Sequence, residues 1–93
     1  MLLGIFRISG HSMLPKFKPD DRIIASSIPY LFSKPRAGDV IVFRYNNKIM
    51  VKRIKKFEGE KIIVAGDNIS DSLKIKQVIR NDILGKVILI LNT

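Results

Sequence analysis

The chain lacks cysteine and any long hydrophobic run. Its 93 residues contain no cysteine, which excludes disulfides, thiolate nucleophiles and cysteine-ligated metal sites and leaves the redox compartment open. The apolar opening Met1 to Phe6 stops at Arg7, whereas a bilayer-spanning helix needs about 20 apolar residues. We therefore expect neither a membrane anchor nor a complete signal peptide here, and the sequence predicts no metal and no cofactor.

Acidic side chains are also scarce. Asp and Glu number 8 against 17 Lys and Arg, so the formal net charge is +9. Such an excess favours an anionic partner, either a phospholipid surface or a nucleic acid. The basic residues are scattered, as in Lys52 to Lys56, and the phenylalanines form no nucleic-acid-binding signature. We therefore expect a solvated basic face or an anionic membrane surface, and consider nucleic-acid binding the weaker explanation.

The sequence predicts one mainly β domain over residues 1–93. Hydrophobic residues make up 46% of the chain, and no linker or internal repeat divides it. Because strands favour β-branched residues between turn signals, we expect a small antiparallel sheet or a partly closed barrel. The expected strands are residues 5–8, 22–25, 40–45, 49–54, 61–65 and 84–91.

Local turn signals fix part of the connectivity. Asn46-Asn47 and Glu58-Gly59 each lie between strand-like runs, which predicts two hairpins and hence three consecutive antiparallel strands. The one helical turn that the pattern allows lies in Ser26 to Phe32, where Pro29 and Pro35 keep it short.

Two residues stand out as candidates for chemistry. Ser12 follows an expected strand in a glycine-containing bend, which can present its hydroxyl outward, although a serine there also serves as an ordinary turn residue. Lys52 shares a strand face with Met50 and Ile54, since strand side chains alternate. Apolar neighbours lower the pKa of a lysine and prepare it to accept a proton. A lysine that reaches solvent from a sheet edge explains the pattern equally well.

The strings around these residues resemble the ordered motifs of the signal peptidase I family. They occur in the family's order between positions 9 and 87. Two of them also resemble the self-cleaving SOS repressors, which are similar in fold. The matching strings are Ser9-Gly10-His11-Ser12-Met13-Leu14-Pro15, Pro35 to Phe43, Val51-Lys52-Arg53-Ile54, Gly66-Asp67-Asn68 with Asp71-Ser72, and Gly85-Lys86-Val87.

The resemblance implies a serine endopeptidase with a Ser/Lys dyad and the fold of the signal peptidase catalytic core. Ser12 would be the nucleophile and Lys52 the general base, and the substrate would be a precursor polypeptide from which a leader or pro-segment is cut. His11 is adjacent to Ser12 in sequence, but neighbours in an extended segment point to opposite faces. We therefore expect His11 in the wall of the substrate cleft and not in a triad.

The resemblance also implies supporting roles near the nucleophile. The backbone N–H of Ser12 would be one oxyanion donor. Gly10 stands where many bacterial relatives have a second, serine donor, and Ser9 lies one residue too early, so the main-chain amide of His11 is a candidate. Met13 and Pro15 are expected along the substrate cleft, with ordinary core packing as the alternative for Met13. Asp20 replaces a glycine of the family pattern, so we expect a left-handed backbone there.

The last catalytic motif of the family resembles residues 66–72. A serine hydroxyl in this motif would orient Lys52, and both Ser70 and Ser72 are candidates. Arg53, Asp67, Asn68 and Asp71 would brace the site, with Asp67 paired to Arg53. A simple Asp-Asn turn is the alternative explanation for Asp67.

Other functions stay open at this stage. A self-cleaving repressor-like regulatory domain would need a scissile segment before the nucleophile, and few residues precede Ser12. An inactive binding module with the same fold would leave Ser12 and Lys52 unexplained. We expect a location at the outer face of the cytoplasmic membrane if the protein is anchored or peripheral, and in the cytoplasm otherwise. The sequence leaves the oligomeric state open.

Overall fold

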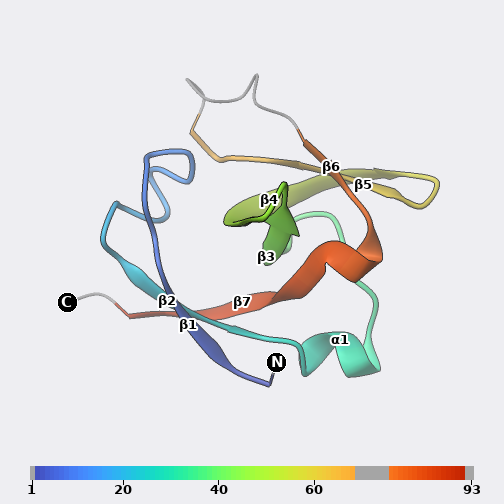
Figure 1. The fold of residues 1–93 in the computed structure, drawn as a ribbon, viewed down its shortest axis with the longest axis horizontal. Helices are drawn as coiled ribbons and strands as arrows, with labels where there is room; N and C mark the ends of the chain where they lie inside the picture. The colour runs from blue at the N-terminus through green and yellow to red at the C-terminus, as the bar shows by residue number, and fades with distance from the viewer. Residues whose placement is uncertain (1, 69–75, 92–93) are drawn as a thin grey trace.

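The computed structural model describes residues 2–68 and 76–91. Within them, seven strands form one antiparallel sheet in the order β1-β2-β7-β3-β4-β5-β6 (Figure 1). In this part of the chain the edge strands β1 and β6 do not pair, so the predicted mainly β fold is confirmed as an open sheet. The elements are β1 (Gly4–Arg7), β2 (Arg22–Ser26), α1 (Pro29–Phe32), β3 (Val40–Tyr45), β4 (Lys48–Glu58), β5 (Lys61–Ala65), β6 (Lys76–Val78), the 3-10 turn η2 (Arg80–Asp82) and β7 (Ile83–Leu91).

Both predicted hairpins are present. Asn46 and Asn47 have φ angles of 50° and 66°, and two consecutive positive φ angles match the twist of a two-residue hairpin turn. The second turn lies one residue later than predicted, because Glu58 pairs with Lys61 and leaves Gly59, with φ 62°, inside it. Strands β3, β4 and β5 therefore form the expected antiparallel run.

Two elements differ from the sequence prediction. Strand β4 continues past Ile54 to Glu58, beyond an irregularity in its pairing with β5 between Ile54 and Lys56. Strand β6 was not predicted, because its three residues include polar Lys76 and Gln77 and form no alternating pattern. The helical turn α1 lies inside its predicted range and begins at Pro29, where a missing N–H costs nothing.

Strand β3 carries the core on both of its faces. Val40 and Val42 join one buried cluster, whereas Ile41 and Phe43 join the other, as the two-residue alternation of a strand requires. All four are less than 9% exposed, and fully burying a side chain of this size contributes about 1.5–3 kcal/mol. Strand β3 is therefore the central support of the sheet.

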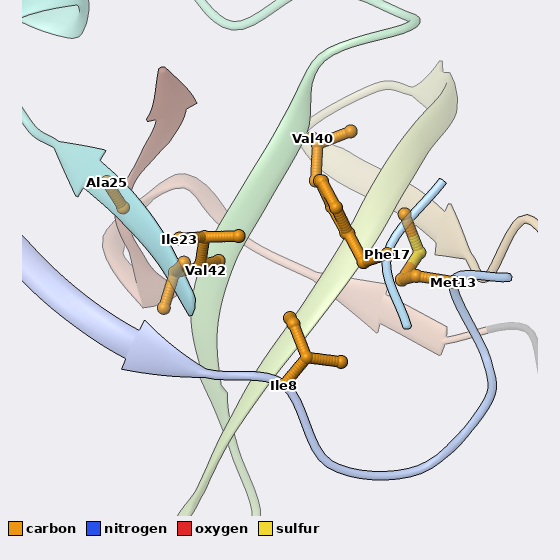
Figure 2. Close-up of a cluster of buried hydrophobic side chains, with 7 residues drawn as sticks. All are labelled: Ile8, Met13, Phe17, Ile23, Ala25, Val40 and Val42. Atoms are coloured by element: carbon orange, nitrogen blue, oxygen red, sulfur yellow. The ribbon is translucent and has the colours of Figure 1, made fainter. Parts of the chain in front are cut away.

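The loop between β1 and β2 is anchored on the first of these clusters. Met13 and Phe17 are 2% and 0% exposed, and Figure 2 shows both in the same cluster as Val40. The base of the loop is closed by two hydrogen bonds of 2.8 Å, from Ile8 N–H to Asp21 O and from Asp20 N–H to Ile8 O. Asp20 has φ 73°, which confirms the predicted left-handed backbone. The loop that carries Ser12 is thus held in place by the core.

The described helical elements are short. Neither α1 nor η2 is long and apolar enough to cross a membrane.

Candidate active site

Ser12 and Lys52 line the same cavity, although they are far apart in the sequence. The cavity has a volume of about 230 Å³ and lies between the start of the β1–β2 loop and strand β4. In Figure 1 these segments are the blue loop after β1 and the green strand β4. The cavity is lined by Arg7, Ile8, Ser9, Ser12 and Met13 on one side and by Lys48, Ile49, Met50, Val51 and Lys52 on the other.

Lys52 is buried, with 4% of its surface exposed. It lies opposite Ile41 in the β3–β4 pairing, and Ile54, two residues along the strand, is 1% exposed. The apolar surroundings predicted from strand alternation are present. A lysine that extends into solvent from the sheet edge does not fit this burial.

Ser12 is half-buried in a turn that follows Gly10. Gly10 has φ 79°, a backbone conformation that favours glycine. Leu14 N–H donates to His11 O at 3.2 Å, and Phe17 N–H donates to Met13 O at 3.0 Å. The turn therefore places the Ser12 side chain at the cavity wall while Met13, the next residue, packs into the core.

The other predicted residues of this loop differ in exposure. Ser9 is exposed and lines the cavity. His11 and Pro15 are exposed and do not line it, and the Leu14–Pro15 peptide bond is cis. Met13 both lines the cavity and belongs to the buried core, so core packing of this residue is confirmed and its contact with substrate stays a prediction.

The segment after β5 packs against the backbone of Ser12. Asn68 N–H donates to Ser12 O at 2.8 Å, and the Asn68 side-chain amide donates to His11 O at 2.8 Å. A Cβ atom added to Gly66 would overlap the Ser12 carbonyl oxygen and lie 3.0 Å from Ser12 Cβ. Gly66 was not predicted as a site residue; its presence beside an Asp-Asn pair was the available signal.

Arg53 and Asp67 connect β4 to the same segment. Arg53 Nε and Nη2 donate to the two Asp67 oxygens, each at 2.8 Å, and Arg53 Nη1 donates to Gly38 O at 2.7 Å. The hydrogen bond from Arg53 lowers the pKa of Asp67, outweighing the effect of burial, and the same bond raises the pKa of Arg53. This bidentate ion pair holds Arg53, the residue next to Lys52, against the segment after β5, which packs on the Ser12 backbone.

The remaining predicted residues cannot be placed relative to the cavity. Ser70, Asp71 and Ser72 lie outside the described residues. Within the part of the chain that the structure describes, no group of three or more His, Cys, Asp or Glu side chains is arranged to hold a metal ion.

A comparison with known protein families agrees with the order of the motifs, with the β fold and with the shared cavity of Ser12 and Lys52. The sequence profile described as "Signal peptidase, peptidase S26" matches residues 1–86. The chain belongs to this signal peptidase family. The predicted resemblance is thereby confirmed over most of the chain.

One curated relative supports the same assignment. A protein named "Signal peptidase I" from Leptolyngbya laminosa is 35% identical over 72 residues. The match covers 67% of this chain and 36% of the relative, so it spans only about a third of that relative's length.

Proposed function

We propose that this chain is the catalytic core of a serine endopeptidase that removes a leader or pro-segment from precursor proteins. Ser12 is the nucleophile and Lys52 the general base. The observation that carries the proposal is that the half-buried Ser12 and the buried Lys52 line one cavity. Membership of the signal peptidase family supports the same reaction class.

In the proposed mechanism, the Ser12 hydroxyl oxygen attacks the scissile carbonyl carbon while the neutral Lys52 amine takes the hydroxyl proton. Lys52 then gives this proton to the leaving amine, and an acyl ester remains on Ser12. Water, deprotonated by Lys52, hydrolyses the ester and releases the second product. Burial of Lys52 favours the neutral amine that the first step requires.

The backbone N–H of Ser12 is the proposed oxyanion donor. Within residues 2–68 and 76–91, this N–H donates to no protein acceptor. Asn68 donates one hydrogen bond to the carbonyl oxygen of Ser12 and one to the carbonyl oxygen of His11. The proposed consequence is a backbone donor that is fixed in direction before the substrate arrives, which is the requirement for stabilising a developing oxyanion.

An open strand edge supports binding of an extended peptide. Strand β4 pairs with β3 along residues 48–53, whereas among the described strands β5 pairs with β4 only from Arg53 onward. The second edge of β4 at residues 48–51 is therefore unpaired among the described strands, and these residues line the cavity. A precursor segment can add to this edge as a further strand, with its scissile bond beside Ser12.

The test is cleavage of a panel of precursor peptides, with the cut position read by mass spectrometry. We expect Ser12→Ala to lose about three or more orders of magnitude in rate while its thermal unfolding stays unchanged. Ser33→Ala is the matched control, because this exposed serine lies next to α1 and outside the cavity. Turnover by Ser12→Ala equal to wild type would rule out Ser12 as nucleophile. Cleavage of the chain itself without peptide cleavage would favour a self-cleaving regulatory domain.

We also propose a peripheral contact with an anionic membrane surface. The net charge of +9 favours anionic lipid, and Leu2, Leu3 and Ile5 at the β1 edge are 66%, 64% and 66% exposed. Apolar side chains beside a basic surface suit the membrane interface. Co-sedimentation with vesicles of mixed anionic and zwitterionic lipid should exceed that with purely zwitterionic vesicles, and Ile5→Asp should weaken it. Equal sedimentation with both vesicle types would contradict this contact.

A further inference from the structure

One end of the cavity is strongly cationic. Arg7 and Lys48 are exposed and line the cavity, and among residues 2–68 and 76–91 no acidic side chain lines it. Lys76 adds a further positive charge close by, because its amine lies 4.8 Å from the ring centre of Tyr45, which is the cross-strand partner of Lys48. The cavity thus favours an anionic group at the end formed by Arg7 and Lys48.

The charges at this end are not compensated by the described part of the protein. Arg7 lies directly opposite Arg22 in the β1–β2 pairing, and like charges in such positions destabilise a sheet. No described carboxylate forms an ion pair with Arg7, Arg22 or Lys48. The carboxylate of Asp21, next to Arg22, accepts a hydrogen bond from Lys18 N–H instead. An arrangement that is unfavourable in the free protein indicates an anionic ligand.

The distance from Lys52 to Lys48 determines which residue of a peptide substrate can place an anionic group at this end of the cavity. Lys48 precedes Lys52 by four residues on β4, which corresponds to about 13 Å at the rise of a strand. A peptide added to the open edge of β4 has the same rise, and residues separated by four positions share a face. The fourth residue from the scissile bond therefore reaches the Arg7 and Lys48 end.

We propose that this end of the cavity selects precursor segments that carry an acidic side chain four residues from the scissile bond. This inference rests on the proposed peptidase function and adds a substrate preference to it. Arg7 and Lys48 are the specificity-determining residues, and neither takes part in the chemical step. A peptide is favoured over a lipid headgroup as the ligand because both cations share their cavity with Ser12.

The test compares peptides that are identical except for Asp, Asn or Lys placed four residues before or four residues after the cut. We expect kcat/KM to be about three- to tenfold higher for Asp than for Lys at one of these positions, as for exposed ion pairs. Lys48→Gln should reduce this ratio and Lys48→Glu or Arg7→Glu should reverse it. Raising the salt to about 0.5 M should bring the ratio towards one.

Lys61→Glu is the matched control. Lys61 is exposed at the start of β5 and does not line the cavity, so the same change of charge there should keep the preference for Asp. Equal kcat/KM for Asp and Lys peptides at both positions would overturn the inference, as would reversal by Lys61→Glu. Loss of vesicle binding in the Arg7 and Lys48 variants with unchanged peptide preference would assign these cations to lipid and also overturn it. Failure of wild type to cleave any peptide would instead refute the proposed function itself.

Discussion

Adding a single methyl group at Gly66 should disable the proposed active site by displacing the backbone of Ser12. A Cβ atom at this position overlaps the Ser12 carbonyl oxygen and lies 3.0 Å from Ser12 Cβ. Restoring ordinary van der Waals distance requires a displacement of about 1 Å. The neighbouring bond from Asn68 N–H to Ser12 O, 2.8 Å long, leaves little freedom for this displacement. Gly66→Ala must therefore move the backbone that carries the nucleophile.

The magnitude follows from the size of that displacement. Misplacing a reacting group by about 1 Å costs about a hundredfold in rate, so we expect kcat to fall by about 10²-fold. Forcing a methyl group into a packed contact also costs about 1–3 kcal/mol of stability. Peptide cleavage under saturating substrate measures the first quantity, and thermal or denaturant unfolding measures the second.

Gly59→Ala is the control for the loss of stability. Gly59 lies in the β4–β5 turn with φ 62°, and a Cβ atom there has no neighbour within 4 Å. We expect this variant to lose about 1–2 kcal/mol of stability through backbone strain alone and to keep its activity. Full activity in Gly66→Ala would refute the argument that the segment after β5 sets the position of Ser12.

The remaining predictions concern protonation. The proposed mechanism requires a neutral Lys52 amine to take the Ser12 proton, so cleavage should rise with pH as the ammonium loses its proton and should then level off. Lys52→Arg should stay inactive at every pH tested, because a guanidinium keeps its proton. An active arginine variant would show that Lys52 is not the base. The lowered pKa of Asp67 means that its pair with Arg53 stabilises the fold above the unfolded-state pKa and that this stability is lost as pH falls through the folded one. Asp67→Asn should cost about 1–2 kcal/mol near neutral pH and progressively less as the pH falls through the lowered folded-state pKa of Asp67; a cost in denaturant unfolding that does not change with pH would contradict this.

Features that depend on neighbours in sequence were predictable here. The Asn46-Asn47 turn follows from two residues that tolerate positive φ angles. Strand alternation also placed Lys52 on one face with Met50 and Ile54. Whether its side chain is buried or reaches solvent stayed open until the structure showed 4% exposure.

Features that depend on distant segments were not predictable from the pattern. Strand β7 lies between β2 and β3, far from both in sequence, and no local signal specifies that order. The contact of Gly66 with Ser12 has the same origin, because it arises only when the end of β5 meets the β1–β2 loop. The resemblance to the signal peptidase motifs identified the candidate site residues. The reason for a glycine at position 66 became clear only from the three-dimensional structure.

Residues Gly66 to Asn68 link the two halves of the proposed dyad. Gly66 packs on the Ser12 backbone, Asn68 donates to Ser12 O, and Asp67 between them binds Arg53. Each residue type suits its contact: glycine permits close approach, a carboxylate accepts both prongs of a guanidinium, and an asparagine supplies a side-chain donor beside its own N–H.

This linkage has a mechanical consequence for the cavity. Arg53 precedes Ile54 and follows Lys52 on β4, so the ion pair with Asp67 fixes the strand that carries the proposed base. Asn68, one residue beyond Asp67, fixes the turn that carries the proposed nucleophile. Because three consecutive residues hold both segments, the separation of Ser12 and Lys52 is set by a short, stiff connection rather than by the long chain between them. A substitution that loosens either contact should therefore lower kcat more than it weakens substrate binding, since the open edge of β4 that would bind the peptide is held separately by its pairing with β3.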